Sequence, residues 1–444
     1  MPPQYTASLD AGARFLTPQV FKQAHQQHKP KKTAPRWNLH ALVTVLLLMT
    51  WTTGDSEAER FATARACYVA RHQHERRPGA SLQGFQQALA KWPLPVLHAL
   101  FAAVRLGLGQ LFGPYFGRDG FVILAVDGSR QECPRSAELE QRLGQCGKNA
   151  SAPMLMISAL VLLPAGLLWS WAVGPGTASE HDLLRQQLPR LPHGTLLVGD
   201  AFYQGYALYQ DILQTRASFL VRLSSKSQLY TDTLRPLPRF RHGLVWYWPE
   251  HAQDSQQPPL RLRLIRVRGR KKHDVWLLTD VPPRRLSRRQ ASAIYRLRWH
   301  VEGVFRTYKR TLPKLTLCSR TEALVYREAE VALLGLQVLQ AQAARPRRSE
   351  GVAVLVLGSA RQELLRLRGE ITTTLGRDLG PWQQRWYREQ LAQVRAGGPG
   401  RKVRRPWPRR KDHKAPKPPK LRVLPKRLKA KMAKRLKAAG DGHP

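Results

Sequence analysis

Residues 121–129 have the sequence FVILAVDGS, in which an apolar run is followed at once by Asp127, Gly128 and Ser129. A short apolar run that ends at turn-forming residues is typical of a buried β-strand. Residues 195–200, TLLVGD, repeat the pattern and end at Asp200. We therefore expect two buried strands, each of which ends at an aspartate.

The residues around these strands predict an α/β fold. Residues 154–173 are nearly all apolar and are interrupted by Pro164-Ala165-Gly166, which predicts two strands joined by a tight turn. Helices are expected from Ser179, as N-cap, to Leu188 and from Ser287 through Lys309. Three strands, a helix, a strand and then a further helix is the order of the ribonuclease-H-like fold. In such an open sheet, side chains at the carboxyl ends of neighbouring strands lie close together.

The charge of the chain favours a polyanionic partner. The sequence has 73 Lys and Arg against 30 Asp and Glu, a formal net charge of +43. Residues 401–444 hold 18 of the basic and 2 of the acidic residues, so the rest of the chain is basic as well. Nucleic acid is the expected partner, and an anionic membrane surface is the alternative.

Pattern and composition divide the chain into five expected segments. These are a polar, loosely ordered lead-in (1–36), a helical N-terminal domain (37–118), an α/β domain (119–345), a helical C-terminal segment (346–396) and a basic tail (397–444). A β-rich insertion is expected in the α/β domain at about 224–285. The N-terminal helices could form a plain bundle or a domain that recognises DNA ends. The tail, rich in Lys, Arg and Pro, is predicted to be disordered.

The cysteines and the apolar runs indicate in which cellular compartment the protein is expected. The four cysteines lack the spacing of a zinc site and are too few for a disulfide scaffold, which favours a reducing cytoplasm. Residues 149–179 carry no charge and could span a bilayer by length, but the interruption at Pro164 favours two strands. We expect a cytoplasmic, nucleoid-associated protein without a membrane span.

A third acid is predicted from residues 295–309, YRLRWHVEGVFRTYK. Tyr295, Arg298, Glu302 and Lys309 have the spacing Y-x2-R-x3-E-x6-K, which on one continuous helix places all four on one face. A carboxylate flanked by two cations and a phenol suits a metal ion beside phosphates. The alternative is a helix whose charges only pair with one another.

With this motif the sequence resembles the DDE transposases of bacterial insertion sequences, in the branch defined by a Tyr-Arg-Glu-Lys signature. The resemblance covers roughly residues 15–345 and includes the motifs around both aspartates and the β-rich insertion. It implies a ribonuclease-H-like catalytic core with Asp127, Asp200 and Glu302 as catalytic and metal-binding residues. Hard carboxylate ligands suit two Mg²⁺ ions, with Mn²⁺ as a substitute.

The resemblance also implies the reaction and the partners. The enzyme would act as an endonuclease at the ends of a mobile element and then transfer the freed strand into target DNA, which is cut-and-paste DNA transposition. Double-stranded DNA would be its substrate, and a homodimer would hold the paired ends.

Residues that contact DNA are also implied by the resemblance. Tyr295 and Arg298 would lie near the transposon end, and Lys309 would contact a phosphate. An aromatic residue of the insertion would stack on a flipped base, although each could equally be a core residue. The candidates are Trp246, Trp248 and Trp276. Ala201 stands where many relatives carry a basic residue, so no basic contact is expected there.

Other acids fit the third position less well. Glu322, Glu328 and Glu330 lack the upstream Tyr and Arg, and Glu180 and Asp182 suit the N-terminus of a helix. Two other functions stay open: a DNA-binding protein of the same fold without catalysis, and a membrane-associated basic protein. The presence of all three acids argues against the first.

Overall fold

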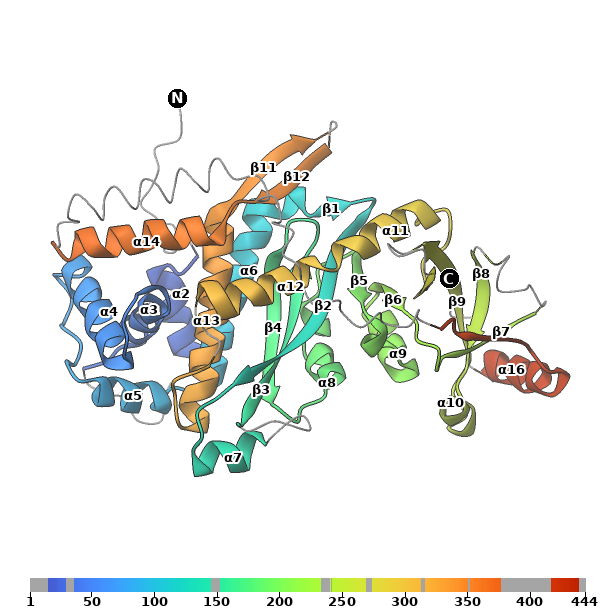
Figure 1. The fold of residues 1–444 in the computed structure, drawn as a ribbon, viewed down its shortest axis with the longest axis horizontal. Coiled ribbons are helices and arrows are strands. Elements are labelled where there is room, and N and C mark those ends of the chain that lie inside the picture. The colour runs from blue at the N-terminus through green and yellow to red at the C-terminus, as the bar shows by residue number, and fades with distance from the viewer. Residues whose placement is uncertain are drawn as a thin grey trace, which may run out of the picture. The chain divides into compact units, whose positions relative to one another are not determined.

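The computed structural model describes residues 15–28, 36–144, 152–232, 240, 242–268, 274–312, 316–349, 352–376 and 417–438. The chain forms two compact units (Figure 1). Unit 1 comprises Met1–Phe116, Gly128–Leu183 and Glu302–Val403; unit 2 comprises Gly117–Asp127, Leu184–Val301 and Arg404–Pro444. The chain thus passes repeatedly from one unit to the other, and the five predicted segments stay predictions.

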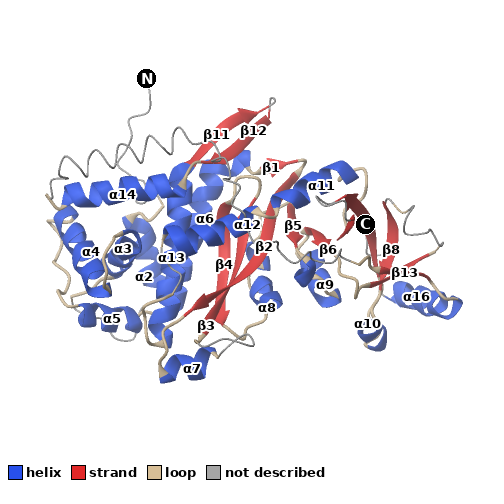
Figure 2. Cartoon of the chain, in the orientation of Figure 1, coloured by secondary structure: helices blue, strands red, loops and turns tan. Residues whose placement is uncertain are grey.

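Unit 1 begins with a set of helices that the local sequence explains (Figure 2). They are α2 (Pro18–Gln27), α3 (Leu39–Trp51), α4 (Glu57–Arg71), α5 (Leu82–Lys91) and α6 (Leu94–Phe112). The side chains of Asn38, Ser56 and Ser81 each accept a hydrogen bond from the backbone N–H three residues later, which fixes where α3, α4 and α5 begin. Helices were predicted within residues 37–118, where α3 to α6 lie. Helix α2 was not predicted, since residues 1–36 were expected to be loosely ordered.

Helix α13 (Glu322–Ala343) is the centre of unit 1, between the N-terminal helices and a β-hairpin (Figure 1). The indole of Trp51 in α3 donates to the carbonyl of Gly335 on one side. On the other side, Gln337 donates to the carbonyls of Leu168 and Trp169 at 2.9 Å each. The helix is therefore buried around most of its circumference.

The hairpin beside α13 consists of β3 (Met154–Leu162) and β4 (Leu167–Pro175). The predicted turn at Pro164 is confirmed, so residues 154–175 do not form a membrane-spanning helix. Among the described residues, only the helical stretch Leu94–Tyr115, which contains α6, is long and apolar enough to cross a membrane. Its side chains at positions such as Leu100 and Val104 are fully buried within unit 1.

The remaining elements of unit 1 include α7 (Ala137–Leu143), α14 (Ala360–Thr374), and a hairpin of β11 (Ala344–Ser349) and β12 (Val352–Leu357). The prediction of a helical segment at 346–396 was wrong in its first part, where residues 352–357 form a strand. Three valines alternate in Val352–Leu357, and β-branched residues favour a strand when a partner strand is available. The part of that predicted segment after residue 376 lies outside the described residues.

Unit 2 is built on a mixed sheet with the strand order β13-β7-β8-β9-β10-β6-β5-β2, with β1 paired to β2. Strand β5 pairs in parallel with both β2 and β6. Along the series β6-β10-β9-β8-β7, each strand is antiparallel to the next. The strands are β1 (Gly117–Arg118), β2 (Phe121–Glu132), β5 (Thr195–Gly199), β6 (Ser218–Arg222), β7 (Gln228–Thr231), β8 (His242–Tyr247), β9 (Leu260–Arg268), β10 (Asp274–Thr279) and β13 (Lys420–Val423). Strands β7 to β10 lie within the predicted β-rich stretch.

Helices complete unit 2: α9 (Tyr206–Gln214), α10 (Glu250–Asp254), α11 (Arg288–Leu297) and α16 (Lys426–Ala438). Like β2, which crosses the boundary after Asp127, two helices span a unit boundary in sequence, α8 (Glu180–Arg185) and α12 (His300–Arg306). Ser179 caps α8 as predicted, since its hydroxyl accepts from the N–H of Asp182. Mixed strands and helices of this kind confirm the predicted α/β class.

Part of the basic tail is ordered, contrary to the prediction of disorder. Strand β13 pairs in parallel with β7, and α16 follows it directly. Met432 of α16 is buried, and the ammonium of Lys431 lies 5.9 Å from the Trp248 ring centroid. Composition alone missed this segment because a strand as short as β13 forms only where an existing strand edge accepts it. The rest of the tail lies outside the described residues.

Candidate active site

The register of two parallel strands brings the first two acids together in unit 2. Ala125 of β2 is paired with Val198 of β5. Asp127 lies two residues further along β2, and Asp200 lies two residues further along as well, directly after the end of β5. Because paired strands lie about 4.8 Å apart, the two aspartates are at neighbouring positions. Contrary to the prediction, β2 does not end at Asp127 but continues to Glu132.

Asp200 begins a turn that holds its side chain in place. It is the N-cap of a short 3-10 helix, Ala201–Tyr203, and its Oδ1 accepts a hydrogen bond of 2.8 Å from the N–H of Phe202. A carboxylate with one oxygen held by the backbone still offers the other oxygen to a ligand. Gly199 lacks a side chain where Tyr203 packs closely, which allows the turn to follow the strand directly.

Arg298, a residue of the predicted Y-x2-R-x3-E-x6-K spacing, contacts the first acid. Its guanidinium lies 3.8 Å from the Oδ2 of Asp127, and its side chain is 8% exposed against 23% for Asp127. Among the residues that the structure describes, the buried Nε of Arg298 has no hydrogen-bond partner. A buried, unpaired N–H costs about 1–3 kcal/mol, so this donor is poised for an acceptor.

Tyr295 belongs to the same group of residues. Burial raises the pKa of its phenol; Arg298 and Arg222 oppose this shift, and Asp200 adds to it. Tyr295 also shares a side-chain hydrogen bond with Arg298. Four predicted site residues, Asp127, Asp200, Tyr295 and Arg298, are thus gathered in unit 2.

The predicted helix from Ser287 through Lys309 is not continuous. Ser287 forms the N-terminal capping box of α11 with Gln290, but α11 ends at Leu297, α12 starts at His300, and Thr307–Thr311 is a π-helical turn. The four signature residues are therefore not on one face of a single helix. Around Arg298 the backbone tightens, since the N–H of Val301 bonds to the carbonyl of Arg298, three residues earlier.

Glu302 and Lys309 belong to unit 1. Glu302 is half-buried in α12, and its convergence with the aspartates remains a prediction. The ammonium of Lys309 donates a 2.6 Å hydrogen bond to the carbonyl of Arg130 in β2. Burial lowers the pKa of Lys309, and Glu132 opposes this shift. Lys309 is thus held against β2, close in sequence to the first acid.

Comparison with known families identifies this arrangement. Residues 118–336 match the family model described as the transposase DDE domain. The chain carries a DDE transposase domain. The transposase is therefore an enzyme that cleaves DNA and transfers strands, and enzymes of this class use divalent metal ions. The match includes Asp127, Asp200 and Glu302 within its bounds.

No match was found among curated proteins. Among solved structures, the chain is similar to a piggyBac transposase in a cryo-EM synaptic complex with hairpin DNA. That similarity has 10% sequence identity and a TM-score of 0.44, over 87% of this chain and 85% of the other.

Sequence reasoning missed two exposed aromatic residues next to the site residues of the transposase. Trp299 is 59% exposed and lies directly after Arg298, whose guanidinium stacks 4.8 Å from its ring centroid. Phe202, 57% exposed, follows Asp200 by two residues. Their positions within the two motifs could have suggested them, because an exposed aromatic ring beside a predicted site residue is a ready stacking surface.

The tryptophans chosen from sequence are placed differently. Trp248 and Trp276 are 1% and 5% exposed, and the indole of Trp248 donates to the carbonyl of Gln257. The structure therefore favours the core alternative for these two. Trp246 is half-buried in β8, with the guanidinium of Arg261 at 6.0 Å from its ring centroid.

The structure explains most of the competing acids by structural roles in unit 1. Glu328 accepts from the N–H groups of Cys318 and Ser319 at 2.9 Å each, and Glu330 lies 3.1 Å from the imidazole of His98. Glu180 is different, because its carboxylate lies against Gly128, where a side chain would collide with it. The residue after the first acid is thus required to be small.

Proposed function

We propose that the transposase performs cut-and-paste transposition with Asp127, Asp200 and Glu302 as its catalytic acids. The observation that carries the proposal is the register of β2 and β5, which sets Asp127 beside Asp200, with Arg298 paired to Asp127. Glu302 is assigned by its place in the Y-x2-R-x3-E-x6-K spacing. This spacing also supports membership of the Tyr-Arg-Glu-Lys branch.

The donor set fits Mg²⁺, with Mn²⁺ as a substitute. Carboxylate oxygens are the preferred ligands of hard divalent cations, and neighbouring strands bring two of them together. When bound, two such ions activate the attacking oxygen and stabilise the leaving oxygen of a phosphodiester. Asp127, Asp200 and Glu302 would hold them.

The residues around the acids suit the substrate's phosphates. The unpaired Nε–H of Arg298 and its remaining guanidinium donors can donate to phosphate oxygens, and the phenol of Tyr295 can donate beside them. In the first step, water attacks the phosphorus at the element's end and the bond to the 3′-oxygen breaks, which leaves a 3′-hydroxyl. That hydroxyl then attacks a target phosphodiester, and the target's own 3′-oxygen leaves.

The proposed setting is the bacterial cytoplasm, on DNA. Two copies of the chain would hold the two element ends, because both ends must be cut and joined together. A net charge of +43 would attract each copy to the duplex. A membrane location is not part of the proposal.

Single-turnover nicking tests the proposal. The substrate is a labelled duplex that carries the DNA flanking the gene, incubated with Mg²⁺ or Mn²⁺. Asp200→Asn should abolish nicking because it removes a negative metal ligand while the N–H of Phe202 keeps an acceptor. Asp211→Asn is the matched control, since Asp211 lies in the same unit and pairs with Arg185 at 2.6 Å. Normal nicking by Asp200→Asn would exclude the assignment.

A further inference from the structure

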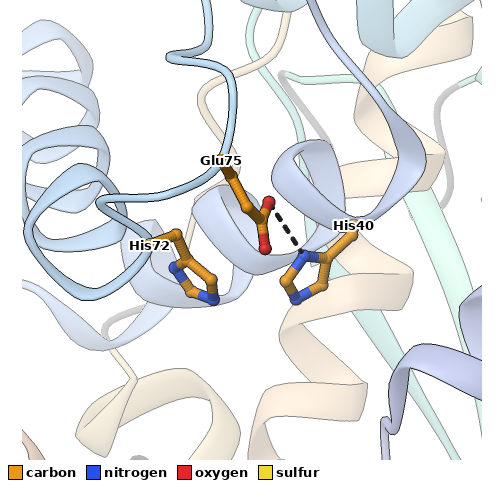
Figure 3. Close-up of side chains that lie close together, drawn as sticks. All are labelled: His40, His72 and Glu75. Atoms are coloured by element: carbon orange, nitrogen blue, oxygen red, sulfur yellow. Dashed lines mark ion pairs between the residues drawn. The ribbon is translucent and has the colours of Figure 1, made fainter.

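Three metal-binding side chains meet among the N-terminal helices of unit 1 (Figure 3). His40 lies in the first turn of α3, His72 is the C-cap of α4, and Glu75 follows in the next loop. One ligand atom from each lies within 4.8 Å of the other two. The carboxylate of Glu75 lies between the two imidazole rings in Figure 3.

The hydrogen bonds of His72 leave one ring nitrogen ready to bind a metal. Its Nδ1 lies 2.9 Å from the carbonyl oxygen of Tyr68. A carbonyl only accepts, so Nδ1 carries the proton and Nε2 keeps its lone pair. Metal-binding histidines characteristically donate their other ring N–H in this way.

The same tyrosine orients the carboxylate. The hydroxyl of Tyr68 donates a 2.6 Å hydrogen bond to Oε2 of Glu75, and its ring stacks on His72 with centroids 4.2 Å apart. The Oε2 of Glu75 also lies 3.7 Å from Nδ1 of His40. Tyr68 is buried, and its hydroxyl also lies 3.4 Å from Nδ1 of His40, so one buried residue contacts all three side chains.

The geometry is close to that of a zinc site. Bonds of about 2.0–2.1 Å in a tetrahedron place ligand atoms about 3.3 Å apart, so modest side-chain shifts would complete the site. The His40 and Glu75 side chains are 29% and 40% exposed, which leaves room for a water ligand. Imidazole nitrogen suits Zn²⁺ and its neighbours in the transition series rather than Mg²⁺.

We propose that His40, His72 and Glu75 bind one divalent transition-metal ion, for which Zn²⁺ is best suited, with water as fourth ligand. The site is separate from the carboxylates of the catalytic acids and does not depend on the proposed function. Cysteine spacing had predicted no zinc site, but this one needs no cysteine. The ion would join the start of α3 to the end of α4 and the following loop, and would thereby stabilise the N-terminal helices.

Metal titration of the full-length protein tests the site. Co²⁺ and Zn²⁺ are added in the presence of excess Mg²⁺, with Co²⁺ absorption and calorimetry as readouts. We expect one Co²⁺ with the intense visible absorption of a tetrahedral site, and competition by Zn²⁺. His72→Ala and Glu75→Gln should each abolish that absorption, and Tyr68→Phe should weaken affinity 10- to 100-fold.

His74→Ala is the matched control, because His74 is exposed in the same loop and is not one of the three ligands. It should bind like the unchanged protein. Melting temperatures with a chelator present show whether each variant folds, and Zn²⁺ should raise the melting temperature only where the site is intact. Unchanged binding in both His72→Ala and Glu75→Gln, or no tetrahedral Co²⁺ in the unchanged protein, would overturn the proposal.

Discussion

At the scale of single residues, the environment of Arg298 says most about the role of its side chain. It is buried, its guanidinium lies 3.8 Å from the carboxylate of Asp127, and its Nε has no hydrogen-bond partner within the described part of the chain. An arginine needed only to neutralise an aspartate would not require an unsatisfied donor. We therefore expect the Nε–H of Arg298 to donate a hydrogen bond to a phosphate oxygen when DNA is bound.

Arg298→Lys should impair cleavage although the positive charge is kept. An ammonium cannot reproduce the planar fork of a guanidinium, and each charged hydrogen bond lost costs about 1.5–3 kcal/mol, roughly 10- to 150-fold in rate. Single-turnover nicking and the melting temperature are measured on the same protein. A variant that is less stable but cleaves normally per folded molecule would reduce Arg298 to a structural ion pair.

Trp299→Ala should weaken binding to DNA ends. Its ring is 59% exposed and already stacked by Arg298, and base–aromatic stacking contributes about 1–3 kcal/mol per base. Trp299→Phe keeps an aromatic face and should retain most of the affinity. Equal affinities for the alanine variant and the unchanged protein, measured by titration of a labelled end, would show that the ring does not contact DNA.

At the scale of elements, sequence predicted what local chemistry determines. The starts of α3, α4 and α5 follow from Asn38, Ser56 and Ser81, whose side chains cap them. The strands that lead to Asp127 and Asp200 follow from short apolar runs. A Thr17-Pro18 pair, as N-cap and first helical residue of α2, offered the same kind of signal and was overlooked.

Where the bounds of an element depend on contacts with residues far away in sequence, local sequence did not predict them. The break after Leu297 occurs where Arg298 turns to meet Asp127, far away in sequence. The extension of β2 beyond Asp127 and the strand β13 both depend on neighbouring strands. For the same reason, sequence could nominate the signature residues but not show that Lys309 donates to a backbone carbonyl.

Gln337→Met tests how α13 is fixed to the β3–β4 hairpin. The substitution keeps the length of the side chain but removes the donor to the carbonyls of Leu168 and Trp169. The free energy of unfolding should fall by about 1–3 kcal/mol, because buried carbonyls lose a partner. Gln73→Met, at an exposed site, is the control in chemical denaturation. No difference between the two variants would contradict a structural role for the amide.

At the scale of the whole molecule, excess positive charge is the dominant property. Part of this positive charge lies on folded structure. Helix α16 has exposed lysines such as Lys434 and Lys437, while its Met432 is buried. A folded basic helix presents its charges in a fixed pattern, unlike a disordered arm. Its contribution to DNA binding can therefore be tested without removing the segment.

Lys434→Gln combined with Lys437→Gln should lower the salt dependence of DNA binding. Each phosphate contact contributes about 0.9 to the log–log slope on B-DNA, so the slope should fall by up to about 1.8. Lys22→Gln with Lys91→Gln, also exposed, changes the net charge equally in unit 1. If both pairs alter the slope to the same extent, α16 contributes only general charge.

The interleaving of the two units has a consequence for biosynthesis. Unit 1 draws on segments as far apart as Met1–Phe116 and Glu302–Val403, and unit 2 needs residues after Arg404. A ribosome makes the chain from the N-terminus, and domains usually fold as soon as their residues have emerged. Here neither unit is complete until nearly all of the chain has been translated. An abortive fragment that ends before residue 302 would contain Asp127 and Asp200 but lack Glu302, the proposed third acid, and neither of its units would be complete.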